Sequence, residues 1–198
     1  MKIGILGATG YTGALITEKL ALHNIDFEVA ARNLDALKIL KTTYSNIKAI
    51  VPIDLTEPHA LFEWVNSIDV LVNCVGPYNV YGHFVREALE KKKSPTIYLD
   101  TTGEQEFVSQ SLRFSSGSSK FEPSSPLNRE PPNSEKSSLY LHSFAFESCL
   151  ADLLAKKICS PQKSYQEIAS YYHFSHARPS PGTRLTMQLA RSFPTYRY

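Results

Sequence analysis

Three glycines near the start of the chain, Gly7, Gly10 and Gly13, have the spacing of a turn that can hold phosphate groups. They follow the apolar run 2–6 directly and precede the helix-forming segment 14–23, so the sequence predicts a strand, a tight turn and a helix. In such a turn, Gly7 allows a positive φ, Gly10 lets a pyrophosphate approach the backbone, and Gly13 lets the helix pack closely. The first N–H groups and the positive end of the helix dipole would face the phosphates. The turn therefore predicts a dinucleotide site.

The spacing of this turn is G-x-x-G-x-x-G, and Ala8 stands where the commoner fingerprint has its second glycine. A glycine triplet alone is weak evidence, and its position directly after an apolar strand is the context that the motif requires. We expect the cofactor to contact the whole turn, including the residues between the glycines, which are Ala8, Thr9, Tyr11 and Thr12.

The residue after the second expected strand, 27–31, is predicted to select the cofactor. A carboxylate at this position binds the ribose diol of NAD, whereas an arginine can hold the 2′-phosphate of NADP. The sequence has Arg32 there and no acidic residue before Asp35. A solvated surface arginine is the alternative interpretation, but the register after the glycine turn favours NADP(H).

Strand-like and helix-like segments alternate along the chain, which predicts an α/β fold with a doubly wound, mostly parallel Rossmann-type sheet. The later strands are expected at 47–51, 69–75, 96–100 and 139–144. The later helices are expected at 34–42, 81–92, 104–114 and 147–158, together with a short helix that Thr56 caps. In such a sheet, ligands bind at the carboxyl ends of the strands.

Polar residues gather after the fourth and fifth expected strands. Asn73 ends a buried strand and needs hydrogen-bond partners, which a cofactor ribose or the neighbouring loop could supply. Tyr78 follows, either as a partner for a nicotinamide ring or as a tyrosine at the rim of the site. The segment after the fifth strand, which consists of Thr101, Thr102, Gly103 and Glu104, is predicted to contact the substrate.

Composition argues against several other classes of function. The chain of 198 residues has a formal net charge of +2 with scattered basic residues, so nothing indicates a nucleic-acid partner. Its three cysteines are widely spaced and predict buried thiols in a reducing compartment. No apolar run approaches the ~20 residues of a transmembrane helix, and the chain begins directly in a core strand, so we expect a cytoplasmic protein. No spacing of His or Cys predicts a metal site, and no nucleophile–base arrangement identifies catalytic residues.

Three motifs occur in one order: G-A-T-G-Y-T-G at 7–13, N-C-V-G-P-Y at 73–78 with Gly82 after it, and Y-L-D-T-T-G-E at 98–104. Together they resemble the saccharopine dehydrogenase-like oxidoreductases, a group that includes the trans-acting enoyl reductases of lipid and polyketide assembly. Looser matches to the same family follow at 144–152 and 181–184.

The resemblance implies hydride transfer from NADP(H) to an activated double bond or imine of a small-molecule or acyl-chain substrate. It assigns the cofactor to the glycine turn, Arg32, Asn73, Gly76 and Pro77. It assigns the substrate side to Tyr78 and 101–104. The family offers no shared catalytic pair that these residues match, and both homo-oligomers and association with a lipid surface stay open.

Two features depart from the family. The segment 115–138 is rich in Ser and Pro and is predicted to be a flexible insertion in a NADP-binding domain at 1–160. Members of the family continue well beyond this length, so we expect 161–198 to begin a truncated α+β substrate domain, with a strand at 167–175 and a helix at 182–193. This departure supports a second class of function, a non-catalytic NADP-binding module or a truncated remnant.

A third hypothesis is an enzyme resembling N-acetyl-glutamyl-phosphate reductase, which shares the glycine turn. Such an enzyme needs a nucleophilic cysteine at the junction of a loop and a helix. Cys74 lies in an expected strand and Cys149 in an expected apolar helix, so the sequence disfavours this hypothesis.

Overall fold

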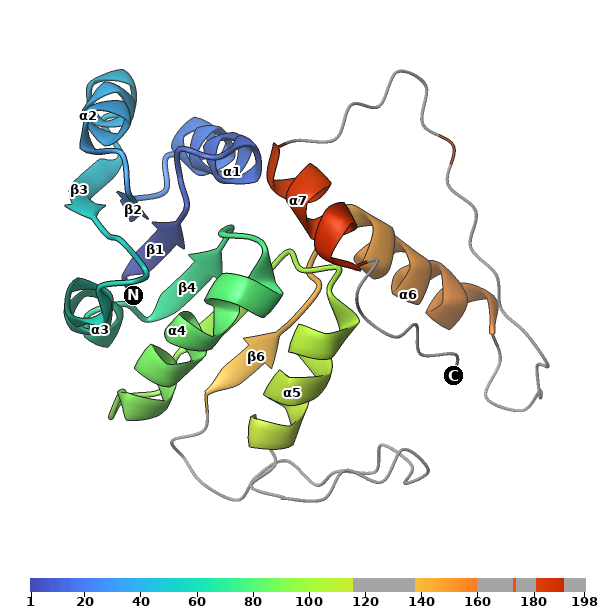
Figure 1. Cartoon of the computed structure of the whole chain (residues 1–198). Helices are drawn as coiled ribbons and strands as arrows, with labels where there is room; N and C mark the ends of the chain where they lie inside the picture. Colours follow the sequence, from blue (N-terminus) through green and yellow to red (C-terminus); the bar gives the residue numbers. More distant parts are fainter. Residues whose placement is uncertain (116–137, 160–172, 174–180, 191–198) are drawn as a thin grey trace.

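A computed structural model describes residues 1–115, 138–159, 173 and 181–190, and it shows a six-stranded parallel sheet between layers of helices (Figure 1). The strands are β1 (Ile3–Leu6), β2 (Phe27–Ala31), β3 (Ile47–Pro52), β4 (Val70–Asn73), β5 (Ile97–Asp100) and β6 (Leu139–Leu141). The helices are α1 (Tyr11–Leu22), α2 (Leu34–Thr43), α3 (Pro58–Asn66), α4 (Tyr78–Lys91), α5 (Gln105–Ser115), α6 (Phe146–Ile158) and α7 (Pro181–Ala190). The predicted doubly wound α/β fold is confirmed.

The strand order β3-β2-β1-β4-β5-β6 extends the sheet in both directions from β1. Leu6 pairs with Ala30 on one side and with Asn73 on the other, and Asn73 pairs with Asp100. Because all these strands are parallel, their carboxyl ends lie level along one edge of the sheet. The glycine turn and the loops after β2, β4 and β5 therefore meet at this edge, where the chain switches direction between β1 and β4.

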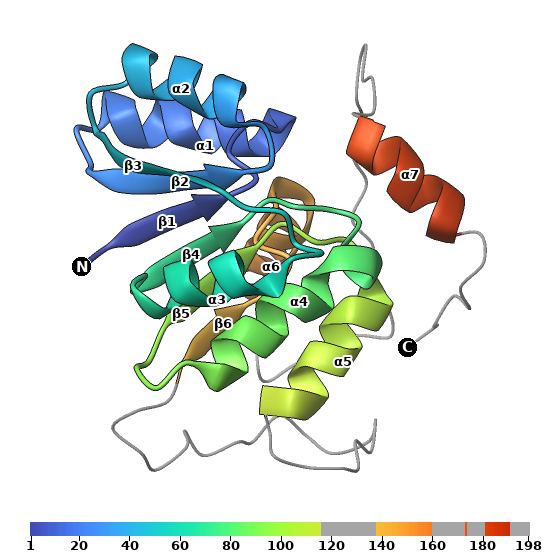
Figure 2. The same cartoon turned by 60° about the vertical axis from the view of Figure 1, so that its left-hand side comes forward.

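Helices cover both faces of the sheet (Figure 2), and a hydrophobic cluster lies on each face. Successive residues of β1 point to opposite clusters, as the pleat of a strand requires: Ile5 to one and Leu6 to the other. The cluster with Ile5 includes Leu37 of α2, and the cluster with Leu6 includes Leu61 of α3 and Val85 of α4. The carboxyl edge thus rests on a strand that is packed on both sides.

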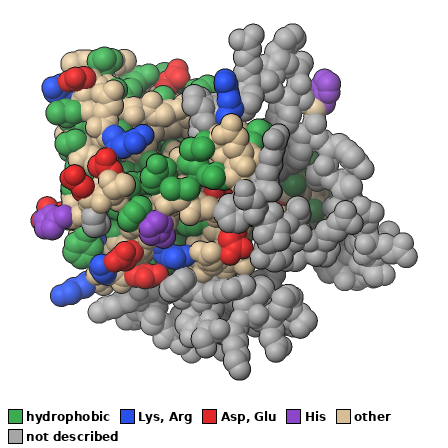
Figure 3. Space-filling view, in the orientation of Figure 1, with side chains coloured by type: hydrophobic (Ala, Val, Ile, Leu, Met, Phe, Trp, Pro, Cys, Tyr) green, Lys and Arg blue, Asp and Glu red, His purple; other side chains and the backbone are tan. Residues whose placement is uncertain are grey.

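Charged side chains of both signs are interspersed on the face drawn in Figure 3, and the described residues form no broad basic patch there. Within the described part of the chain, no helix combines the length and the apolar character that crossing a membrane requires.

Two helix starts differ from the sequence expectation. Helix α4 begins at Tyr78 rather than at Tyr81, because a carboxylate from another loop caps it there, as described below. Helix α3 has Glu57 at its N-cap rather than Thr56. The backbone N–H and the hydroxyl of Thr56 instead donate to Asp54 Oδ1, at 2.9 and 2.7 Å.

The later segments match the expectation where the structure describes them. Helix α6 agrees with the expected range 147–158 to within a residue, and α7 occurs where a helix was expected from Gly182 onward. Strand β6 begins at Leu139 as expected and ends at Leu141, three residues earlier than the expected range 139–144. Nearly all of the predicted insertion 115–138 and all but one residue of a strand expected at 167–175 lie outside the described residues. The division into domains at 1–160 and 161–198 stays a prediction.

Candidate functional site

The glycine turn has the backbone geometry that its sequence predicts. Gly7 has φ +82°, and a Cβ there would lie 2.7 Å from Val75 Cγ2. A Cβ on Gly13 would lie 2.2 Å from the carbonyl oxygen of Gly7, so helix α1 packs directly on the turn. At Gly10 a Cβ would meet only the Gly7 oxygen, at 3.3 Å. The first and third glycines therefore close the turn, and the middle glycine leaves its outer face open.

The amino end of α1 is available at this open face. Gly10 is the N-cap of the helix, and no side chain caps its first turn. Thr9, Gly10 and Tyr11 are exposed, whereas Ala8 and Gly13 are buried and Thr12 is half-buried. A helix amino terminus with unpaired N–H groups and no capping side chain is suited to an anion such as a phosphate.

Arg32 lies next to this turn and is exposed. Strand β2 ends one residue before it, and Gly7 N donates to Ala30 O at 2.7 Å, which joins the end of β2 to the turn. The pKa of Asp54 is held below its usual range mainly by the hydrogen bonds from Thr56, and the Arg32 guanidinium adds to this effect. Arg32 is thus a solvent-facing cation beside the predicted phosphate site.

Asn73 at the end of β4 is buried, and the protein itself supplies partners for its amide. Its Nδ2 donates to the hydroxyl of Tyr98 at 3.1 Å, and its Oδ1 accepts from Val75 N at 3.0 Å. The sequence allowed either a cofactor ribose or the neighbouring loop as the partner of this amide. In the structure its partners are Val75 of that loop and Tyr98 of the adjacent strand β5. Beyond it, Gly76 is exposed and Pro77 is buried.

Tyr78 is packed inside the molecule, with 6% of its surface exposed. Its hydroxyl donates to Asn73 O at 2.8 Å and lies 3.1 Å from Thr101 Oγ1, while its ring packs on Phe107 with centroids 5.6 Å apart. Burial raises the pKa of Tyr78 above its ordinary value. The interpretation as a rim tyrosine is therefore wrong, because the phenol joins the β4 and β5 loops from within.

Glu104 caps a helix that is distant in sequence. Its two carboxylate oxygens accept from Tyr78 N and Asn79 N, both at 2.8 Å, at the amino end of α4. Thr102 Oγ1 accepts from Glu104 N at 3.0 Å, and Thr186 of α7 donates to Glu104 Oε1 at 3.2 Å. Of the four residues predicted to contact substrate after β5, Thr102 and Glu104 are buried, Thr101 is half-buried and Gly103 is exposed.

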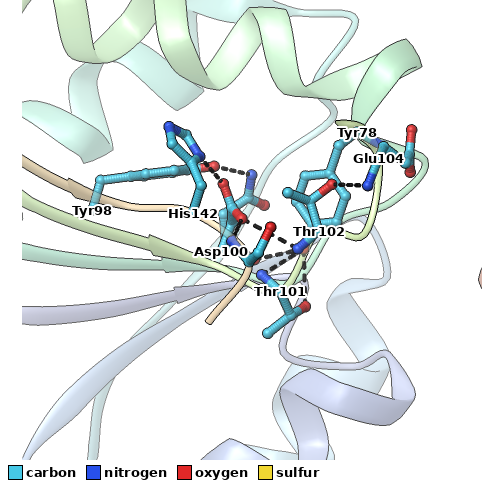
Figure 4. Close-up of polar contacts among 9 residues, drawn as sticks. Tyr78, Tyr98, Asp100, Thr101, Thr102, Glu104 and His142 are labelled. Atoms are coloured by element: carbon cyan, nitrogen blue, oxygen red, sulfur yellow. Dashed lines mark hydrogen bonds and ion pairs between the residues drawn. The ribbon is translucent and has the colours of Figure 1, made fainter. Parts of the chain in front are cut away.

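A buried pair that the sequence analysis did not identify lies beside this loop. His142 Nδ1 is 2.6 Å from Asp100 Oδ2, and both side chains are almost entirely shielded from solvent (Figure 4). Asp100 Oδ1 also accepts from Ser143 N at 2.9 Å and from Thr102 N at 3.2 Å. Asp100 ends a buried strand as Asn73 does, so the same argument could have found it. Its partner follows 42 residues later, and no sequence spacing indicates that pairing.

Cys74 does not have the character of a nucleophile. Burial raises the pKa of its thiol to about 12, and the nearby Asp100 charge acts in the same direction. In the described part of the chain, no three His, Cys, Asp or Glu side chains lie together as a metal site would require. The sequence also has two histidines three positions apart, His173 and His176. Because His176 lies outside the described residues, the finding on metal sites does not cover these two together.

Known proteins match this chain over about half of its length. Saccharopine dehydrogenase-like oxidoreductase of Homo sapiens is 32% identical over 121 residues, which cover 52% of this chain and 28% of the human protein. A trans-acting enoyl reductase of Mycobacterium ulcerans is 30% identical over 116 residues, covering 56% of this chain and 27% of that protein. A lipid droplet localized protein of Caenorhabditis elegans is 29% identical over 116 residues, covering 52% and 26%. These matches confirm the resemblance read from the motifs.

The matched part spans little more than a quarter of the length of these relatives. Apo saccharopine dehydrogenase (L-Glu forming) of Saccharomyces cerevisiae superposes with a TM-score of 0.46 and 23% identity, over 55% of this chain and 23% of that one. No protein-family model matches the chain.

Proposed function

We propose that residues 1–115 are the NADP(H)-binding part of an oxidoreductase. The observation that carries the proposal is the open face of the glycine turn: Gly10 has room outside it, and the amino end of α1 behind it has no side-chain cap. The turn fits a dinucleotide. A Cβ would clash at Gly7 and Gly13, which close the turn, whereas the outer face at Gly10, where the phosphates would lie, is open. The similarity to oxidoreductases over half of the chain supports the same function.

Arg32 supports NADP(H) over NAD(H). It is an exposed cation at the end of β2, level with the turn, where an arginine can hold a 2′-phosphate. The first acidic residue after it, Asp35, forms an ion pair with Lys38 at 3.1 Å within α2. The described contacts therefore direct that carboxylate to its own helix rather than to a ribose diol.

Bound at the turn, the cofactor would supply a hydride for reduction of an activated double bond or imine. This chain's own residues would orient it. Asn73 and Tyr78 fix the β4 loop, where Gly76 and Pro77 form the remainder of the proposed cofactor site. On the substrate side we propose Thr101 and Gly103, the two residues of the 101–104 segment that are not buried.

The substrate is proposed to be a small molecule or an acyl chain. The name of the Mycobacterium ulcerans relative, a trans-acting enoyl reductase, supports a double-bond substrate. The name of the Caenorhabditis elegans relative supports association with a lipid surface. A cytoplasmic location and a homo-oligomer stay predictions from the sequence.

A non-catalytic NADP(H)-binding module is the second candidate, and a specific observation favours it. The polar side chains expected at the reacting side are used within the fold: Asn73 binds Tyr98, Tyr78 binds Thr101, and Glu104 caps α4. Among the described residues, none of these three offers an uncommitted group for substrate chemistry. Binding of NADPH without turnover of any 2-enoyl thioester would support this candidate.

The test is titration of the purified chain with NADPH and with NADH, followed by nicotinamide fluorescence. The expected result is binding of NADPH at micromolar concentration and at least about tenfold weaker binding of NADH. Arg32→Ala should remove this preference, and Lys19→Ala, which deletes a charge at the other end of α1, should retain it. Folded protein that binds neither nucleotide would contradict the proposal, and equal binding of both would contradict the role of Arg32.

A further inference from the structure

A cavity lies away from the glycine turn, between helices α4 and α5 and the outer strands β5 and β6. Its volume is about 130 Å³, and its walls are largely apolar, from Leu89, Phe107 and the rings of Tyr98 and Tyr140. Tyr98 and Tyr140 lie with their ring centroids 5.8 Å apart. An apolar cavity of about 150 Å³ binds benzene in another protein, so this volume is near that of one six-membered ring.

Four polar side chains interrupt the apolar lining: Ser111, His142, and the pair Arg86 and Glu90 of α4, whose Nε and Oε1 lie 3.8 Å apart. Ser111 of α5 is 6% exposed, and its Oγ has no hydrogen-bond partner among the described residues. His142 lines the cavity from the end of β6, and its Nδ1 is committed to Asp100 at 2.6 Å. Figure 4 shows the other ring nitrogen directed away from Asp100.

A buried hydroxyl without a partner is costly, so its presence in a cavity indicates a polar group of a bound molecule or a water. An ordered water needs two to four polar partners, whereas most of this lining is apolar. An aromatic ring that carries one polar group could contact the apolar lining with its ring and hydrogen-bond to Ser111 with its polar group. The lining thus favours an organic molecule over water.

We propose that this cavity binds a small, neutral aromatic molecule that carries a hydroxyl group. Its ring would lie among Tyr98, Phe107 and Tyr140, because aromatic rings prefer offset or edge-to-face contacts with one another. Its hydroxyl would pair with Ser111 Oγ or with the ring nitrogen of His142 that points away from Asp100. The charged groups at the cavity are paired with one another, Arg86 with Glu90 at 3.8 Å and Asp100 with His142 at 2.6 Å, so the proposed ligand is neutral. The site is separate from the glycine turn and does not depend on the proposed nucleotide function.

The experiment is an NMR titration of the whole chain with phenol, using toluene as a probe of the same shape without the hydroxyl. Phenol at millimolar concentration should shift the His142 ring and Ser111 amide resonances saturably, with toluene at least about threefold weaker. Ser111→Ala should weaken phenol about threefold to tenfold and leave toluene unchanged. Ser109→Ala, a matched change on the same helix outside the lining, should alter neither.

Two outcomes would overturn the proposal. The first is folded protein whose Ser111 and His142 resonances do not respond to phenol, which would leave the cavity to water. The second is phenol binding that persists unchanged in Ser111→Ala and in the cavity-filling Ser111→Leu, which would place phenol elsewhere. Equal affinity for toluene and phenol would contradict the proposed hydrogen bond between the ligand hydroxyl and the protein. Because none of these readouts uses a nucleotide, failure here is distinguishable from failure of NADPH binding.

Discussion

Individual side chains at the carboxyl edge divide into two groups according to direction. Thr9, Tyr11 and Arg32 face solvent around the glycine turn, where a nucleotide can reach them. Asn73 and Tyr78 face inward and bind other parts of the protein. Residue type alone does not separate these groups, since a tyrosine and an amide at the end of a strand are suited to either role.

The buried thiol of Cys74 should react slowly with alkylating reagents. Burial raises the pKa of its thiol to about 12 from an ordinary 9.0, so the folded chain should hold about a thousandfold less thiolate than an exposed cysteine at neutral pH. Iodoacetamide should therefore alkylate Cys74 far more slowly in folded protein than in urea, as read by mass spectrometry of its peptide. Equal rates in both states would restore the hypothesis of a nucleophilic cysteine.

The strands and the glycine turn could be predicted because their signals are local. Apolar runs of a few residues mark each buried strand, and two of the three glycines, Gly7 and Gly13, occupy positions where a side chain would clash or need positive φ. The start of α4 could not be predicted, since its cap, Glu104, follows 26 residues later. The Asp100–His142 pair depends in the same way on β5 and β6 lying side by side, which only the folded sheet establishes.

Helix α4 is the element whose position depends most directly on a distant side chain. Its N-cap residue, Pro77, provides no side-chain hydrogen bond, and Glu104 replaces it. On the other side of the helix, a Cβ at Gly82 would lie 2.2 Å from the Phe107 ring, so α4 and α5 are in close contact. Glu104 of the β5–α5 loop thus holds the end of α4, and Phe107 of α5 packs against its face.

Replacing Glu104 tests this arrangement. Glu104→Ala should lower the free energy of unfolding by about 1–2 kcal/mol, because two first-turn N–H groups lose a charged acceptor. Glu104→Gln keeps one acceptor oxygen and should cost about half as much. Urea unfolding followed by circular dichroism measures both, with Glu18→Ala on the exposed side of α1 as the control. A urea midpoint for Glu104→Ala equal to that of the control would show that the cap is not needed.

At the scale of the whole molecule, burial of one thiol and two phenol groups predicts how the free energy of unfolding depends on pH. The pKa values of Cys74, Tyr78 and Tyr98 are raised in the folded state from ordinary values of 9.0 and 10.0. The unfolded chain therefore releases these protons first. Stability should be fully present below pH 9.0 and should fall as the pH rises through 9.0 and then 10.0, by up to about 1.4 kcal/mol per pH unit for each group.

Urea midpoints measured across this alkaline range check the prediction. Cys74→Ala should flatten the first part of the decline, which begins near the ordinary thiol pKa, and leave the steeper tyrosine part. A midpoint that stays constant while the pH rises above both ordinary values would contradict the burial that the fold implies.

Within the described residues, the proposed dinucleotide surface at the glycine turn and the cavity proposed to bind a small ring are separate sites. Only the first coincides with the switch point of the sheet, where the order of strands reverses between β2 and β4 around β1. This location, together with the similarity to oxidoreductases over half of the chain, is why nucleotide binding is the central claim.

The most direct test is equilibrium binding of NADPH to the wild-type chain and to Gly10→Ala. A Cβ at Gly10 meets only the Gly7 oxygen, at 3.3 Å, a tight contact that a shift of a few tenths of an ångström relieves. The methyl group would lie at the proposed phosphate surface, and thermal unfolding of the variant, measured alongside, establishes that it is folded. We predict that wild type binds NADPH and that Gly10→Ala binds it at least about tenfold more weakly. Equal binding by both proteins, or no binding by folded wild type, would contradict a nucleotide site at the glycine turn.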